Sequence, residues 1–429
     1  MPQNLRARLE RIRNTKEQHA TPCVPAPQCE KKEKEPVKKS SRKTDGTKWK
    51  EAGYKVMSRT LTLPLALPAV LPVTLPWLLP DLAKNPDTTG ALPEPDRFLF
   101  FDLETTGLSG GAGTVAFLAA FGRFIPEKGK QSAYKKLEVT QFLLLDYPGE
   151  NDFLENALSV INNCNKPFFL TTYNGKSFDT PLLKTRCLMN GLAFPQVMQL
   201  DLLHPARRLW KRVISSCSQA NVETQVLGLD RTGDTPGAMA PDIWFNFLRS
   251  GEDFTEKKGS ASCQALLGIC DHNVKDIFGL ASLFAAFIKI AAAPLDAAAR
   301  FLCDEENLAM LWRRRDQNNN NTAALLLAAA AKNYPRSRLR LGFDYFRQGC
   351  YEKGRAALKM LTMTNVKWKV PCSITVQALA LRSLAIDAEQ RLGCKDTALK
   401  YIEAATSLPQ LPAGLKADLE KRLGRLTAH

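Results

Sequence analysis

Two kinds of hydrophobic pattern divide the chain. Short apolar runs of strand length, bounded by turn residues, predict strands near 97–105, 114–125, 137–146 and 167–173. Apolar positions at helical spacing predict helices near 150–163, 177–190, 217–227, 241–250 and 263–292. The order β-β-β-α-β-α predicts an α/β domain over residues 93–295, in which three antiparallel strands are followed by parallel ones and helices flank the mixed sheet.

From residue 304 to residue 429 the pattern is helical throughout, which predicts an all-α region. Two helix–Gly–helix segments within it resemble tetratricopeptide-type repeats, although Gly349 and Gly393 are 44 residues apart, longer than the usual period. The segment Val366–Cys372 is the expected insertion, and Gln317–Asn321 an expected loop. Such repeats would bind a partner protein or extend a nucleic-acid path; alternatively, the region is only a helical cap on the enzyme.

The first 60 residues predict a disordered basic tail, because they carry 16 Lys or Arg residues against seven Asp or Glu residues. The whole chain has a formal net charge of +16 and a pI of about 9.4, which favours a polyanionic partner such as nucleic acid. A tail of this kind either tethers the protein to nucleic acid or is simply solvated.

Leu-Pro pairs recur with a fixed spacing between the tail and the α/β domain. Pro64, Pro68, Pro72, Pro76 and Pro80 recur at every fourth position, each after a leucine. Prolines at this spacing would leave a helix with unsatisfied carbonyls on each turn, which a bilayer cannot solvate. Residues 61–92 are therefore expected to form an extended, polyproline-like linker and not a membrane span.

Cysteine usage and the charged N-terminus bear on localisation. The 11 cysteines are scattered without a C-x-x-C pair, which indicates reduced thiols and neither a disulfide framework nor a zinc site. The N-terminus lacks the apolar core of a secretory signal. We expect a cytoplasmic protein.

The clearest candidate for a chemical site lies at the end of the predicted strand near 97–105. Asp102 and Glu104 are two residues apart, so on a strand both carboxylates point to the same face. A cation such as Mg²⁺ or Mn²⁺ would neutralise their repulsion. Alternatively, the two acids only face solvent at a strand end.

Two further acids occur in contexts that fit the same site. Asp179 follows an apolar run and an Asn174–Gly175 turn, which places it in the first turn of a helix. There it would serve a metal or merely stabilise the helix dipole. His272 and Asp276 are four residues apart on a predicted helix, so they share one face and form either part of a site or a surface pair.

Combined, these blocks resemble the DEDD superfamily of 3′–5′ exonucleases with a ribonuclease-H-like fold, and within it the bacterial YprB-like branch. The resemblance covers roughly residues 95–290. It rests on Phe100–Thr114, Tyr173–Asp179, Asp201–Trp210 and His272–Ile277. His-type members usually space the last pair as H-x₄-D and Tyr-type members as Y-x₃-D, whereas this chain carries a His at the Tyr-type spacing.

The resemblance implies hydrolysis of phosphodiesters with two Mg²⁺ or Mn²⁺ ions about 3.5–4 Å apart. Asp102 would be shared by both ions, Glu104 and Asp276 would complete the first site, and Asp179 would hold the second ion. His272 would accept the proton of the attacking water.

Candidate nucleic-acid ligands surround these acids. The Gly-rich segment Gly107–Thr114 lacks the Lys-Ser/Thr of a phosphate loop, so it either lets the backbone approach a nucleic-acid terminus or is only a hairpin turn. Arg207, Arg208, Lys211 and Arg212, beside Trp210, would line a strand-binding groove or form a solvated helix face over a buried Trp. The residues expected to contact nucleic acid are Thr105, Gly107, Asn174, Lys176, Arg207 and Arg208.

Three functions remain open from the sequence. The first is a metal-dependent exonuclease that trims single-stranded DNA or RNA from the 3′ end. The second is an adaptor that binds nucleic acid or protein through its helical repeats without catalysis. The third is a structure-specific endonuclease on the same fold.

Overall fold

A mixed sheet of seven strands forms the first half of the molecule, in the order β1-β2-β5-β4-β3-β6-β7. The computed structural model describes residues 48–84, 92–107, 113–126, 133–164, 168–254, 259–315 and 321–428. The strands are β1 (Lys50–Gly53), β2 (Val56–Pro68), β3 (Phe98–Thr105), β4 (Ala116–Pro126), β5 (Ala133–Leu144), β6 (Phe169–Thr172) and β7 (Met198–Asp201). β3, β4 and β5 pair antiparallel, whereas β6 and β7 add in parallel beside β3, as predicted.

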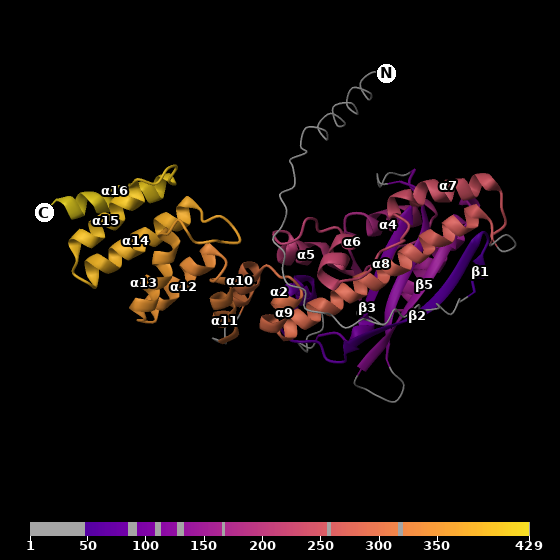
Figure 1. Ribbon diagram of the computed structural model, residues 1–429. Helices are drawn as coiled ribbons and strands as arrows, with labels where there is room; N and C mark the ends of the chain where they lie inside the picture. Colours follow the sequence, from indigo (N-terminus) through magenta and orange to yellow (C-terminus); the bar gives the residue numbers. More distant parts are fainter. Residues whose placement is uncertain are drawn as a thin grey trace, which may run out of the picture. The chain divides into compact units, whose positions relative to one another are not determined.

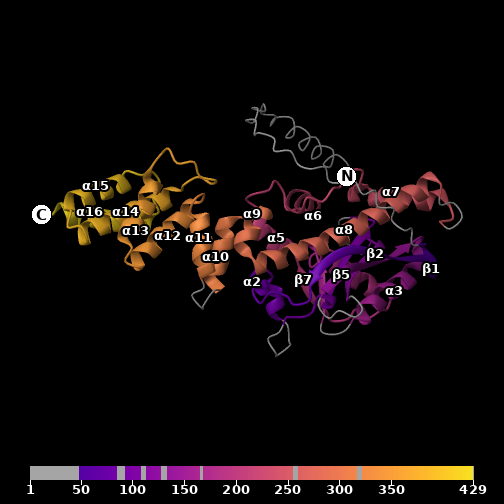
Figure 2. The ribbon, with the colours of Figure 1, turned by 60° about the horizontal axis from the view of Figure 1, so that its bottom comes forward.

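Helices cover both faces of the sheet. They are α3 (Glu150–Asn162), α4 (Asp179–Met189), α5 (Leu203–Trp210), α6 (Gln219–Val222), α7 (Ala240–Ser250) and α8 (Ala261–Ala292). The long helix α8 runs along the sheet in Figure 1, and Figure 2 shows α3 on the side of the strands away from α8. The predicted mixed sheet with flanking helices is confirmed.

Strand periodicity decides which side of the sheet carries the candidate acids. On β3, Phe98 and Phe100 face α8, where both contact Phe284, with ring centroids 4.5 and 5.7 Å apart. The intervening Leu99 and Phe101 pack into the core that includes residues of α3. Because alternate residues of a strand share a face, Asp102 and Glu104 continue the row of Phe98 and Phe100 on the α8 side.

The prediction of a polyproline-like linker over 61–92 is wrong for the described part of that segment. Residues up to Pro68 belong to β2, which pairs with β5, and the chain then forms α2 (Leu75–Leu78) and a 3₁₀ turn (Pro80–Lys84). β1 pairs only with Val56–Ser58, so the rest of β2 lies at the sheet edge. Pro64 and Pro68 lie in this edge part, where no further strand needs the backbone N–H that proline lacks. Four-residue spacing also satisfies the two-residue period of a strand.

The all-α region after residue 304 is confirmed. Its helices are α10 (Glu305–Arg315), α11 (Asn321–Ala330), α12 (Pro335–Arg347), α13 (Tyr351–Lys359), α14 (Ile374–Gln390), α15 (Lys395–Thr406) and α16 (Ala413–Thr427), and α9 (Pro294–Arg300) precedes them. Gly349 (φ 75°) and Gly393 (φ 62°) adopt the left-handed conformation that ends a helix and separate α12 from α13 and α14 from α15. Val366–Cys372 lies outside regular structure between these pairs. The assignment to tetratricopeptide-type repeats stays a prediction.

Other expectations have different outcomes. The basic tail as far as residue 47 and most of the expected loop 317–321 lie outside the described residues. Residues 50–60, assigned to the tail, instead form β1 and the start of β2. The nine cysteines that the structure describes are all free. Within the described ranges, no helix combines the length and apolarity needed to cross a membrane.

Candidate active site

The end of β3 carries the two acids of the first motif toward α8. Asp102 accepts a hydrogen bond from the side-chain amide of Asn273 on α8, with Nδ2 and Oδ2 2.7 Å apart. The side chain of Glu104 is 12% exposed and lies 4.0 Å from His272, measured from Oε1 to Nε2. The strand end and the helix therefore meet at these acids.

Helix α8 presents His272 and Asp276 on one face, as their spacing predicts. His272 Nε2 lies 3.1 Å from Asp276 Oδ2. Glu104, His272 and Asp276 each offer an atom within 4.8 Å of the others, which makes this trio a candidate metal-binding group.

Asp179 approaches the same acids from the first position of α4. The turn before it is held by the buried Asp201 at the end of β7. Asp201 accepts hydrogen bonds from the backbone amides of Asn174 (2.8 Å) and Lys176 (3.2 Å). Asn174 has a positive φ of 67°, a conformation that Asn tolerates better than most residues. The strand ends thus fix the turn that delivers Asp179.

Burial and neighbouring carboxylates raise the pKa values of three of these acids. Burial raises the pKa of Asp102 well above its ordinary value, and the nearby carboxylates of Asp276, Asp179 and Glu104 raise it further. Burial likewise raises the pKa of Glu104 to about 8 and that of Asp179 to about 7. Negative charge at this point is therefore costly unless a cation offsets it.

The pKa of His272 moves in the opposite sense to that expected from burial. Burial alone would lower it, but hydrogen bonds and negative charge from Asp276 and Asp234 raise it to about 9. His272 is therefore protonated at neutral pH while no cation is bound at these acids.

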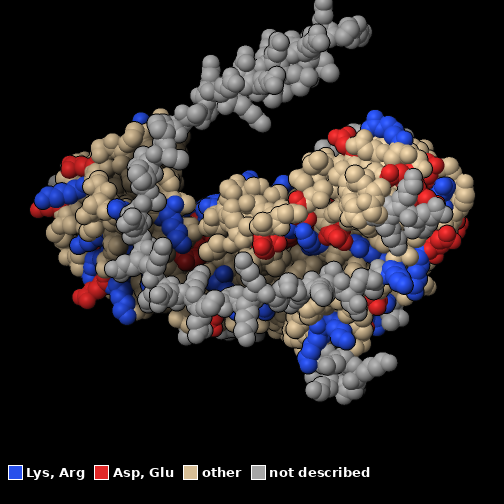
Figure 3. All heavy atoms as spheres, turned by 45° about the vertical axis from the view of Figure 1, so that its right-hand side comes forward, with Lys and Arg blue, Asp and Glu red and all other residues tan. Residues whose placement is uncertain are grey.

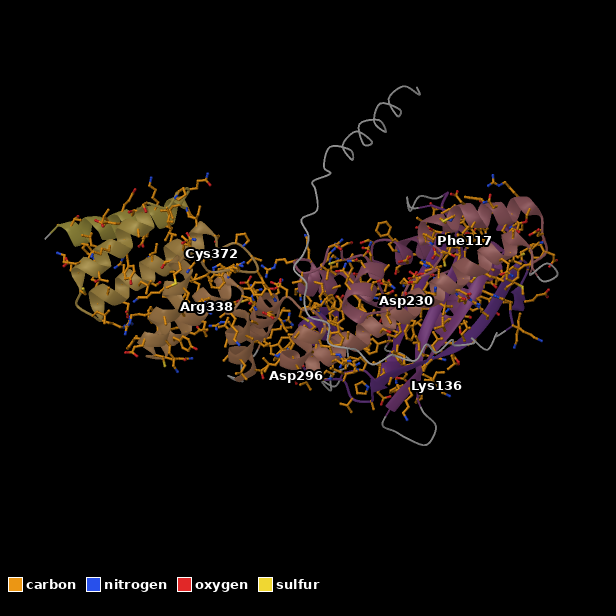
Figure 4. The ribbon with its side chains drawn as sticks, viewed as in Figure 1. Phe117, Lys136, Asp230, Asp296, Arg338 and Cys372 are labelled. Carbon is orange, nitrogen blue, oxygen red and sulfur yellow. The ribbon has the colours of Figure 1, made fainter. Side chains whose placement is uncertain are left out.

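Asp234 and Arg231 belong to the site but were missed by sequence reasoning. Asp234 Oδ2 lies 2.8 Å from His272 Nδ1, and its other oxygen accepts a hydrogen bond from Lys275 (2.9 Å). Arg231 donates to Asp276 at 2.5 Å. Both residues come from the irregular segment 228–236, and Figure 4 shows Asp230 of this segment beside α8. A segment without periodicity gives no signal that predicts these contacts.

Gly237, at the end of this segment, lies against the site. A Cβ atom there would be 3.0 Å from His272 Nε2 and 3.9 Å from Glu104 Oε1. The absence of a side chain at this position leaves room beside the ring nitrogen and the carboxylate.

Sequence reasoning also overlooked Asn273, which lies on the helix α8. Its side-chain oxygen accepts a hydrogen bond from the buried Gln141 on β5 (2.8 Å), which also donates to the carbonyl of Cys270 (2.9 Å). The amide group of Asn273 is therefore oriented to donate to Asp102. The sequence offered one signal for Asn273, its place next to His272 on a predicted apolar helix. A polar residue buried on such a helix needs a hydrogen-bond partner.

The six residues expected to contact nucleic acid have different surroundings. The Thr105 hydroxyl donates to the carbonyl of Gly107 (2.9 Å), while residues 108–112 of the Gly-rich segment lie outside the described residues. The ammonium group of Lys176 forms an ion pair with Asp81 (2.5 Å). Arg207 is exposed and Arg208 is half-buried on α5. The neighbouring Trp210 is buried against Phe287, as the alternative interpretation of this segment expected.

The residues present fit a divalent cation. Three donor atoms from two carboxylates and an imidazole converge, and the carboxylate of Asp179 is close enough to raise the pKa values of both Asp102 and Glu104. Carboxylate oxygens are the ligands that Mg²⁺ and Mn²⁺ favour, so this donor set suits either ion.

Comparison with known proteins agrees with this geometry. Residues 99–288 match the model of the RNase_H superfamily. Over 192 residues the chain is 35% identical to the uncharacterized protein YprB of Bacillus subtilis (strain 168). The aligned part is 44% of this chain and 41% of YprB, so the chain spans less than half of the length of this relative. Together, the match and the relative support a ribonuclease-H-like domain in this part of the chain.

Proposed function

We propose that the protein is a metal-dependent 3′–5′ exonuclease of the DEDD type that hydrolyses single-stranded nucleic acid. The observation that carries the proposal is the convergence of Glu104, His272 and Asp276 beside the half-buried Asp102. Carboxylates whose pKa values are raised by burial and by neighbouring carboxylates are typical of a site built for a positively charged cofactor. A structural role alone would not require this repulsion.

The proposed roles follow from the position of each residue. Asp102 would be shared by two ions, with Glu104 and Asp276 at one of them and Asp179 at the other. Bound Mg²⁺ or Mn²⁺ would supply an activated water and offset charge on the phosphoryl group. His272 would accept the proton from that water, for which its ring must first be neutral. Cations at Glu104 and Asp276 would lower the pKa of His272, because they offset the negative charge that raises it.

Asp234 is a positioning residue in this proposal. Its hydrogen bond with Nδ1 of His272 (2.8 Å) leaves Nε2 directed toward Glu104 and Asp276. The Lys275 and Arg231 side chains in turn hold Asp234 in place, at 2.9 Å in each case. This arrangement fixes the ring nitrogen that accepts the proton.

Digestion of a 5′-labelled single strand tests the proposal, with DNA and RNA in parallel and with Mn²⁺ or EDTA. Products that shorten stepwise from a free 3′ end only with metal would support an exonuclease. Internal cleavage of a 3′-blocked strand would support the structure-specific endonuclease instead. An absence of cleavage, together with no thermal stabilisation by Mn²⁺, would favour the adaptor, whose helical repeats would then bind its partner protein.

A further inference from the structure

We infer that helix α10 extends the nucleic-acid-binding surface of the nuclease domain, with Arg314 and Arg315 joining Arg208 of α5 to bind the sugar-phosphate backbone beyond the nucleotide being cleaved. This inference rests on the proposed function. It assigns a polynucleotide-binding role to the first helix of the all-α region.

Helix α10 is held firmly against α5. The backbone amide of Asp304 donates to the carbonyl of Leu209 (2.7 Å), and the indole of Trp210 donates to the carbonyl of Phe301 (2.7 Å). Arg212 donates to the buried Asp304 carboxylate (2.8 Å). These buried contacts hold the start of α10 against the end of α5.

Two arginines at this junction have structural partners. Arg212 also forms an ion pair with Glu306 (2.9 Å), and Arg313 donates to Asp344 on α12 (2.9 Å). Their charges are neutralised within the protein, so they are not free to bind a phosphate.

Arg208, Arg314 and Arg315 differ, because no carboxylate in the described part of the chain forms an ion pair with them. Among the described residues, Arg315 donates to an uncharged group, the carbonyl of Pro76 (3.2 Å). Burial lowers the pKa of Arg208, and the charges of Arg315 and Arg314 lower it further. The side chain of Asn307 on α10 donates to the carbonyl of Arg208 (2.9 Å), and Arg314 and Arg315, two turns after Asn307, lie on the same face of this helix.

Basic residues on one face of the molecule do not single out a binding site. On the face seen in Figure 3, Lys and Arg side chains are interspersed with Asp and Glu. A group of unpaired arginines is therefore more informative than the net charge. Guanidinium groups form paired hydrogen bonds with phosphate oxygens, and a bound strand would offset their repulsion.

The position of α5 connects this cluster to the proposed active site. α5 begins at Leu203, just after the Asp201 carboxylate that holds the turn leading into Asp179. A strand whose end lies at the acids can therefore continue along α5 toward α10. The helix α10 would then increase affinity for long strands and leave the hydrolytic step itself unchanged.

The test compares Arg314→Ala/Arg315→Ala with the control Lys416→Ala/Lys421→Ala, which removes the same charge from exposed positions on α16. Binding of fluorescein-labelled oligothymidylate of about 20 nucleotides is measured by anisotropy in EDTA, over a range of salt concentrations. We expect the arginine variant to bind roughly tenfold more weakly and its salt slope to fall by about 1.4, or about 0.7 for each phosphate that is no longer neutralised. The control should match the wild type.

Unchanged affinity and salt slope in the arginine variant would overturn the inference, and so would an equal loss in the lysine control. Hydrolysis of the p-nitrophenyl ester of thymidine monophosphate with Mn²⁺ separates this outcome from failure of the proposed function. We expect the arginine variant to hydrolyse this small ester at the wild-type rate. If the wild type binds the long strand through these arginines but does not hydrolyse the ester, the proposed nuclease function is refuted and the inference about binding stands.

Discussion

At the scale of single residues, the candidate site combines features that oppose stability. Asp102 is half-buried near other carboxylates, and Glu104 and Asp179 have raised pKa values of about 8 and about 7. Sites that bind charged cofactors commonly carry such a cost, because the cofactor and not the fold supplies the compensating charge.

Replacing Asp102 by Asn should raise the melting temperature of the metal-free protein. The substitution removes a carboxylate whose ionisation is disfavoured by burial and by its neighbours, but it keeps an oxygen for the hydrogen bond from Asn273. A gain of about 1 kcal/mol would raise the melting temperature by about 2–4 °C for a domain of this size. Calorimetry in EDTA measures the change, with Asp271→Asn as the control on the exposed side of α8. A lower melting temperature than the wild type would show that the Asp102 charge is already compensated.

Stability of the metal-free protein should fall as pH rises from about 4 to about 8. The pKa of Glu104 is higher in the folded state (about 8) than its ordinary value of 4.5, so the folded protein binds this proton more tightly than the unfolded chain. Its favourable contribution is present at low pH and is lost as pH approaches 8. Mn²⁺, which competes with the same protons, should stabilise the protein more at pH 8 than at pH 6. Denaturation with and without Mn²⁺ at both pH values provides the test, and equal Mn²⁺ stabilisation at the two would contradict it.

The role of His272 can be separated from that of its partner Asp234. His272→Ala should slow hydrolysis by about 10²–10⁴-fold if the ring accepts the proton. Asp234→Asn should lower kcat with little change in KM and alter the ¹⁵N shift of Nδ1, because the partner of that nitrogen changes. Kinetics and NMR of both variants are the measurements. A loss below tenfold for His272→Ala would leave His272 only a structural role.

The acids and the histidine that the sequence predicted lie on regular secondary structure. Asp102, Glu104, His272 and Asp276 lie on a strand and a helix whose periods place them on known faces. Asp234 and Arg231 lie in an irregular segment, so their contacts with α8 depend on tertiary structure that no local pattern encodes.

At the scale of elements, β2 shows how one spacing can support two structures. Prolines at every fourth position argue against a helix, but they are compatible with an edge strand. Pairing of β2 with β5 decided the outcome, and residues so distant in sequence carry no local signal of that pairing. The strands β3, β4 and β6 were predictable because each is apolar enough to be a buried strand, and β5 was predictable because its apolar positions alternate with polar ones and end in an apolar run.

Truncation should distinguish the basic tail from the sheet. Removal of residues 1–47 should preserve the fold but weaken binding to nucleic acid and flatten its salt dependence, if the tail contacts phosphates. Removal of residues 1–60 should in addition lower the melting temperature, because it deletes β1 and the buried Val56 and Met57 of β2. Calorimetry and binding at several salt concentrations compare the two. Equal melting temperatures would show that β1 and the start of β2 contribute no stability.

At the scale of the whole molecule, an acidic site lies in a chain with a formal net charge of +16. Such a balance suits a polyanionic substrate that must approach buried carboxylates with the help of cations. The fold class of both halves followed from hydrophobic periodicity. The arrangement of α10 on α5 did not, because it depends on buried contacts such as those of Asp304 and Trp210.

The most direct measurement is the rate of single-strand hydrolysis with saturating Mn²⁺ by the wild type and by Asp102→Asn, with folding of both verified by calorimetry. We expect metal-dependent hydrolysis by the wild type and a loss of at least about 10³-fold in the folded variant, because the proposed shared ligand is gone. Equal rates in the two proteins would contradict a two-metal site at these acids.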